Sequence, residues 1–254
     1  MRKKYVIANF KMNKIDSEVD GYMSTIIPLV VGAKCEVMLA VPNVSIKTAV
    51  ERAKDSNIVI AGQNLNENNF GAYTGEVNAE MLAGVGAGAC IVGHSERRNY
   101  YGETNDLANK KVLKALKSGL VCVLCIGETL YDRKNNLVDQ VLQSQIADCL
   151  SGLYANELKN IVIAYEPIWA IGSGSILEPV DIEDAMKHIR KVLANIYDEE
   201  IANSVSILYG GSVTDSNAKE ISKIAGVDGV LVGGASLVPE KFGKIVSVFS
   251  NLKK

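Results

Sequence analysis

The chain has 254 residues, of which 48% are hydrophobic and 22% charged, and its formal net charge is −2. This balance is typical of a globular protein and excludes a strongly basic surface for nucleic acid, so we expect any phosphate to be bound by local groups. The apolar run after the basic residues 2–4 is too short for a signal peptide, and no run approaches the roughly 20 apolar residues that span a membrane. We therefore expect a cytoplasmic protein that binds neither nucleic acid nor membranes.

Strand-like apolar runs alternate with helix-like segments along the whole chain. The runs cover residues 5–11, 36–41, 58–63, 89–93, 120–126, 161–164, 205–209 and 229–232. Their spacing is that of a βα unit, and no change of composition divides the chain. A single (β/α)8 barrel over residues 1–254, with its active site at the carboxyl ends of the strands, accounts for this pattern. An open, doubly wound sheet predicts a glycine-rich fingerprint after the first strand, where residues 9–13 contain no glycine.

Two of the predicted helices have distinctive ends. The first helix should be capped by Asp16 or Ser17 and should kink or end at Pro28. The helix that begins at Pro179 has an apolar stripe that extends to Ile196. His188 lies off this stripe, so we expect it in solvent and without a role.

The five cysteines lie mostly in apolar runs. An odd number of cysteines in such a chain favours reduced, buried thiols over a disulfide framework. Cys122 and Cys125 have the CxxC spacing, but both lie in the strand-like run 120–126. Residues three apart in a strand point to opposite faces, so we expect both thiols to pack in the core and not to share a metal ion.

Polar side chains of reactive types stand where several strand-like runs end. Asn9 and Lys11 share one face of the first run by its period of two, His94 follows the fourth run, Glu128 the fifth and Glu166 the sixth. In a barrel the carboxyl ends of all strands open on one face, so we expect Asn9, Lys11, His94 and Glu166 to meet there. A carboxylate, an imidazole and an ammonium group together suit proton transfer next to a carbonyl.

Glycine-rich turns follow the last two runs, at residues 210–212 and 233–236. Bare backbone N–H groups in such turns bind anions, and the loops after strands seven and eight are a recurrent phosphate site in barrels. We therefore expect a small phosphorylated substrate. No metal is implied, because neither histidine has a second histidine or a usable cysteine cluster nearby.

Two connections have the composition of functional loops. Residues 164–175 combine Pro167, Trp169 and two isoleucines with glycines, which suits a lid with an apolar underside. Residues 64–78 form a long polar connection that contains Phe70 and Tyr73. Loops of this length are usually functional or form interfaces, so we interpret it as a dimer contact.

The segments 9–13, 71–76, 91–98, 125–128, 164–172 and 209–212 together resemble the triosephosphate isomerase family, over about residues 5–248. The resemblance implies a TIM barrel that interconverts dihydroxyacetone phosphate and D-glyceraldehyde 3-phosphate through an enediolate in glycolysis and gluconeogenesis, without a cofactor. This family is itself a standard example of a neutral histidine electrophile and a water-excluding lid.

The resemblance also assigns roles to residues. It implies Glu166 as base, His94 as electrophile and Lys11 as the cation. It implies Asn9, Ser95 and Glu96 as supporting groups, Asn9 and Lys11 as substrate contacts, and phosphate binding by the backbone at Gly172, Ser212, Gly233 and Gly234. Members are usually homodimers in which the loop carrying Thr74 reaches toward the partner's active site.

The chain departs from the family pattern in two places. Phe10 stands where the family usually has Trp, which we expect to alter packing only. Residues 173–177, including Ser175, Ile176 and Leu177 at the end of the lid, differ from the common hinge, so we expect altered lid kinetics and an unaltered reaction. The alternatives are another sugar-phosphate barrel enzyme, as in tryptophan or histidine biosynthesis, and a phosphate-binding barrel without turnover.

Overall fold

The computed structural model describes residues 2–170 and 177–250, and a closed barrel of parallel strands forms its centre. The strands are β1 (Tyr5–Asn9), β2 (Glu36–Ala40), β3 (Ile58–Gly62), β4 (Ala89–Val92), β5 (Val121–Ile126), β6 (Ile161–Tyr165), β7 (Ser206–Tyr209) and β8 (Gly229–Val232). Each strand pairs with the next along the chain, and β8 pairs with β1, with Gly229 opposite Tyr5. The predicted TIM barrel and its strands are thereby confirmed.

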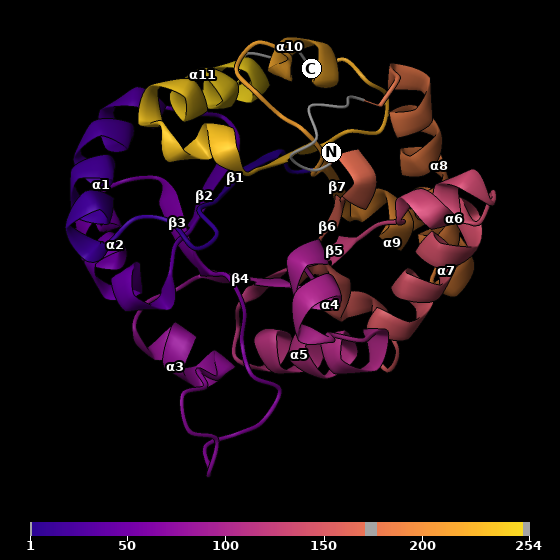
Figure 1. Ribbon diagram of the computed structural model, residues 1–254, viewed down its shortest axis with the longest axis horizontal. Helices are drawn as coiled ribbons and strands as arrows, with labels where there is room; N and C mark the ends of the chain where they lie inside the picture. Colours follow the sequence, from indigo (N-terminus) through magenta and orange to yellow (C-terminus); the bar gives the residue numbers. More distant parts are fainter. Residues whose placement is uncertain (1, 171–176, 251–254) are drawn as a thin grey trace.

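Helices surround the barrel as an outer ring (Figure 1). They are α1 (Asp16–Val30), α2 (Ile46–Ala53), α3 (Ala79–Gly84), α4 (Ser95–Tyr101), α5 (Asn105–Lys117), α6 (Leu130–Lys134), α7 (Val138–Cys149), α8 (Pro179–Ile196), α9 (Glu199–Ser204), α10 (Ala218–Ile221) and α11 (Pro239–Ser250). Short 3₁₀ turns are η1 (Asn43–Ser45), η2 (Ala155–Asn160), η3 (Ile168–Ala170) and η4 (Gly234–Leu237). None of these described helices is long and apolar enough to cross a membrane.

Alternating side chains of the strands build two apolar layers. In β1, Tyr5 and Ile7 belong to a cluster that fills the barrel, whereas Val6 and Ala8 belong to the cluster between strands and helices. Cys122 and Cys125 divide in the same way, because residues three apart face opposite sides of β5. All five cysteines are free and buried, as predicted.

Several predicted helix details are wrong. The cap of α1 is Ile15, not Asp16 or Ser17, and its backbone N–H donates to Glu18 at 2.9 Å. The helix does not end at Pro28 but continues to Val30, so only the alternative of a kink at Pro28 stays a prediction. Ile196 is 42% exposed, because it lies at the last residue of α8. His188 is half-buried against α7, with Nε2 3.0 Å from the carbonyl oxygen of Asp139, so it does not stand free in solvent.

We predict that Gly229→Ala destabilises the barrel, whereas Gly21→Ala stabilises it. A Cβ on Gly229 would lie 1.9 Å from the carbonyl oxygen of Tyr5 across the seam between β8 and β1, whereas a Cβ on Gly21 meets nothing within 4 Å. The first change should lower the free energy of unfolding by about 3 kcal/mol or more. The second lies within α1 and should raise it by about 0.5–1 kcal/mol.

Urea unfolding followed by far-ultraviolet circular dichroism, at one protein concentration for all variants, measures both changes. Equal stability of the Gly229→Ala variant and the unmodified chain would contradict the close approach at the seam.

Candidate active site

A cavity of about 280 Å³ opens at the carboxyl ends of the strands. It is lined by Asn9, Lys11, His94, Glu166, Gly210, Gly211, Ser212, Val213, Thr214, Leu231, Gly233, Gly234 and Ala235. The structure thus brings together the strand-end residues and the two glycine turns that the sequence singled out. Gly172 and residues 173–176 lie outside the described residues, and Thr74 is exposed on the loop between β3 and α3.

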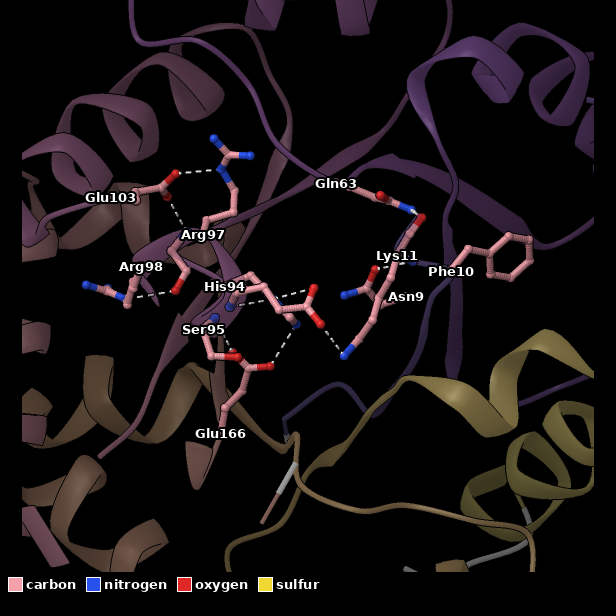
Figure 2. A network of polar contacts seen from close by, with 12 residues as sticks. Asn9, Phe10, Lys11, Gln63, His94, Ser95, Arg97, Arg98, Glu103 and Glu166 are labelled. Atoms are coloured by element: carbon pink, nitrogen blue, oxygen red, sulfur yellow. Dashed lines mark hydrogen bonds and ion pairs between the residues drawn. The ribbon is translucent and has the colours of Figure 1, made fainter. Parts of the chain in front are cut away.

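Glu166 is a buried carboxylate held between two donors (Figure 2). Its Oε1 lies 3.0 Å from Nε2 of His94, and its Oε2 accepts the backbone N–H of Ser95 at 3.0 Å. Burial has the largest influence on the pKa of Glu166 and raises it, but His94, the Ser95 N–H and the Lys11 charge together outweigh burial and lower the pKa. The carboxylate is therefore ionised in this arrangement.

His94 follows β4 after Gly93, a glycine with φ of +73°. Its Nδ1 accepts the backbone N–H of Glu96 at 3.2 Å, which requires an unprotonated nitrogen, so the neutral ring carries its proton on Nε2, facing Glu166. Burial is the largest influence on the pKa of His94 and lowers it, but the charge and hydrogen bond of Glu166, aided by Glu96, raise it overall. Its acid–base state thus depends on whether Glu166 stays beside it.

Lys11 lies beyond the end of β1 in the left-handed region, with φ of +52°. This backbone costs a residue other than glycine roughly 1 kcal/mol or more. Two contacts hold it there: Asn9 Oδ1 accepts the Lys11 N–H at 3.0 Å, and Gln63 Nε2 donates to the Lys11 carbonyl at 2.9 Å. Its ammonium group lies 2.7 Å from a carboxylate oxygen of Glu96. Asn9 and Lys11 both line the cavity, as predicted. Lys11 is placed there by this left-handed turn and not by alternation along a strand.

Two glycines leave room for Glu166. A Cβ on Gly127 would lie 1.7 Å from the carbonyl oxygen of Glu166, and a Cβ on Gly210 would lie 2.9 Å from its Cγ. The residues that follow β5 and β7 therefore pack directly against the backbone and side chain of Glu166. A larger residue at either position would displace the carboxylate.

An ion cluster around the buried Glu103, which contacts the backbone of Gly93 just before His94, was missed by sequence reasoning. Glu103, 3% exposed, accepts the Gly93 N–H at 2.8 Å and contacts Arg97 Nε at 2.8 Å (Figure 2). It also contacts the ammonium group of Lys111. Burial raises the pKa of Glu103, but Lys111, Arg97 and the Gly93 N–H lower it overall. Glu103 lies in a polar connection with no apolar pattern to reveal its burial. Gln63, by contrast, is the last residue of the predicted run 58–63 and directly follows β3, so attention to polar residues at strand ends could have found it.

The glycine turns form the opposite side of the cavity. Asn217 Nδ2 donates to the carbonyl of Ser212 at 2.9 Å and fixes the first turn. Lys11 reaches the second turn, because its Cε lies 3.4 Å from the position of a Cβ on Gly233. Backbone N–H groups beside an ammonium group suit a phosphate. Among the described residues, no group of three or more histidine, cysteine or acidic side chains is placed to hold a metal ion.

Glu128, the other acid at a strand end, does not line this cavity. Its side chain is 0% exposed, and its Oε1 accepts the indole N–H of Trp169 at 2.9 Å and lies 3.2 Å from the Tyr165 hydroxyl oxygen. Burial raises its pKa.

Phe10, at the position where the family usually has Trp, is fully buried and packs edge-on against Tyr22 with ring centroids 4.8 Å apart.

Comparison with known proteins agrees with this geometry. A model of the family described as triosephosphate isomerase matches residues 4–249. The chain is 41% identical to the triosephosphate isomerase of Protochlamydia amoebophila over 97% of its length and 93% of the relative's. It is 43% identical to that of Geotalea uraniireducens, over 97% of this chain and 98% of the relative.

The fold is also similar to a solved structure. The crystal structure of triosephosphate isomerase from Bartonella henselae superposes with a TM-score of 0.88 at 35% sequence identity, covering 97% of this chain and 99% of that one. The family match spans the strands, the cavity residues and both glycine turns. This chain therefore belongs to the triosephosphate isomerase family.

Proposed function

We propose that this cavity interconverts dihydroxyacetone phosphate and D-glyceraldehyde 3-phosphate, the reaction of the family in glycolysis and gluconeogenesis. The observation that carries the proposal is the convergence of an ionised carboxylate, a neutral imidazole and an ammonium group on one cavity beside two glycine turns. Glu166 removes the carbon-bound proton and returns it to the neighbouring carbon, so no electrons leave and no cofactor is needed.

His94 and Lys11 act on the substrate oxygens. The Nε2–H of His94 donates to the carbonyl oxygen and moves protons between the two oxygens, while the Lys11 ammonium group stabilises the developing negative charge. Asn9 and Glu96 support them: Asn9 holds the Lys11 backbone, and Glu96 contacts the Lys11 ammonium group. The backbone N–H of Glu96 keeps His94 in the required tautomer. Ser95 holds Glu166 through its N–H until substrate arrives.

The phosphate binds at the glycine turns. We assign it to the backbone N–H groups of Ser212, Gly233 and Gly234, with Lys11 between the phosphate and the reacting carbons. Gly172, which lies outside the described residues, is the further ligand expected from the family. An enediolate can expel a neighbouring phosphate in water, so a closing lid would protect the intermediate.

We further propose a cytoplasmic homodimer. Phe70 and Tyr73 are 67% and 47% exposed on the loop between β3 and α3, which projects from the barrel in Figure 1. A second cavity of about 310 Å³ adjoins Lys11, His94 and Glu96. This cavity suits the tip of the same loop from a second copy, with Thr74 at the interface. Exposed aromatic side chains on a projecting loop are typical of an interface.

Glu166→Gln is predicted to abolish the reaction. The amide keeps the shape of the side chain but cannot accept the substrate proton, so kcat should fall about a thousandfold or more. Isomerisation of D-glyceraldehyde 3-phosphate measures this, with Glu80→Gln, an exposed carboxylate of α3, as the control. Unchanged conversion by Glu166→Gln would exclude Glu166 as the base. No conversion by the unmodified chain would overturn the proposal in favour of another sugar-phosphate enzyme or a barrel without turnover.

The same variant should lower the pKa of His94. Burial depresses this pKa, and Glu166 is the strongest group that raises it, so removing the carboxylate leaves burial dominant. Nitrogen-15 NMR titration of the two histidines measures the change. His188, which contacts Asp139 on α7, is the internal reference. A His94 pKa that stays constant or rises in Glu166→Gln would contradict the arrangement of charges described above.

Tyr73→Asp is predicted to weaken the dimer about a hundredfold, because it would bury a charge where an aromatic ring should pack. Sedimentation velocity across a concentration series measures the shift from dimer to monomer. Tyr154→Asp is the control, since Tyr154 is 77% exposed outside this loop. A monomeric unmodified chain, or a Tyr73→Asp variant that remains as dimeric as the control, would refute the proposed interface.

A further inference from the structure

Arg133 of α6 connects three segments near the catalytic base. Its guanidinium carbon lies 5.1 Å from the ring centroid of Trp169, within the range of a cation–π contact. One of its nitrogens lies 2.8 Å from Asp181 of α8, and another lies 3.6 Å from Oε1 of Glu128. The cavity residues do not include Arg133. Its contacts therefore serve the surroundings of the site and not the substrate directly.

Glu128 needs a neighbouring cation. Its side chain is 0% exposed, Oε1 carries the contacts to Trp169 and Tyr165, and Oε2 has no hydrogen-bond partner among the described residues. A buried carboxylate is costly unless it is paired and hydrogen-bonded. Arg133 supplies positive charge to it from α6. Without this charge, Glu128 would be a poorer acceptor for the Trp169 indole.

Trp169 is linked to Glu166 by a short, hydrogen-bonded stretch of backbone. The Ile168 N–H donates to the Glu128 carbonyl at 3.1 Å, and the Ala170 N–H donates to the Pro167 carbonyl at 2.9 Å. The Glu166 N–H donates to the Ile126 carbonyl at 2.7 Å. A displaced indole would therefore strain the segment that begins with the base. A misplacement of about 1 Å can cost a hundredfold in rate.

We propose that Arg133 is a positioning residue for the base: it holds Trp169, and with it the backbone that carries Glu166, against α6 and α8. It acts both by stacking on the indole and by supporting the Glu128 carboxylate that receives the indole N–H. The planar, forked guanidinium can stack and pair at the same time, which a lysine ammonium group cannot. This inference rests on the proposed function, because it assumes that Glu166 is the base.

The test compares Arg133→Met and Arg133→Lys with Arg2→Met. Arg2 is a matched control, since its side chain is 29% exposed against 25% for Arg133, and it pairs with Asp228 outside the cavity. Arg133→Met should lower kcat about tenfold while KM changes less than twofold. The kcat of Arg133→Lys should lie between that of Arg133→Met and that of the unmodified enzyme, because lysine restores the charge without the stacking. Arg2→Met should leave both constants unchanged.

Tryptophan fluorescence provides an independent measurement, because Trp169 is the single tryptophan of the chain. Its emission should shift to longer wavelength in Arg133→Met and stay constant in Arg2→Met. Arg133→Met and Arg2→Met variants with equal kcat and equal emission would overturn the inference. If the unmodified chain lacks isomerase activity, the proposed function fails, and emission alone decides whether Arg133 holds Trp169: a shift supports the contact, and no shift overturns it.

Discussion

Closure of β8 onto β1 is the constraint on which the rest of the structure depends. Once the parallel strands form a ring, their carboxyl ends must open on a single face, so residues far apart in sequence become neighbours. Asn9, His94 and Glu166 meet for this reason alone. The seam leaves no space for a side chain at Gly229, because the Tyr5 backbone occupies it. A backbone contact at the amino ends of the strands thus underlies the site at their carboxyl ends.

Burial of charge is the second organising feature, and it is balanced locally. Glu166, Glu103 and Glu128 are each almost fully buried, and burial alone would raise the pKa of each. Glu166 and Glu103 have enough hydrogen-bond donors and cations nearby to hold their pKa below the ordinary value, whereas the pKa of Glu128 remains raised. The difference follows from their partners: Glu103 faces both Arg97 and Lys111, but Glu128 keeps one oxygen without a partner among the described residues.

The sequence predicts the barrel and most of the cavity because both follow from periodicity and from strand ends. Strand alternation also separates Cys122 from Cys125, and the glycine turns identify the side of the cavity suited to phosphate. Periodicity cannot reveal a polar residue buried by the packing of distant segments, so Glu103 escapes it. It also fails where the backbone leaves regular structure. The left-handed turn at Lys11 depends in part on the distant Gln63, and no local pattern indicates that α1 continues past Pro28 to Val30.

The contact between Glu166 and His94 has a further consequence for catalysis. The imidazole and the Ser95 N–H contact the Glu166 carboxylate and hold its pKa down, which makes it a weak base. When the carbonyl oxygen of a substrate accepts the His94 N–H, Glu166 loses one of these partners. Burial, which raises the pKa of Glu166, remains. The same exchange removes the carboxylate that raises the pKa of His94 and so favours the neutral ring. In the proposed mechanism, substrate binding thus raises the basicity of Glu166 and keeps His94 neutral in a single step.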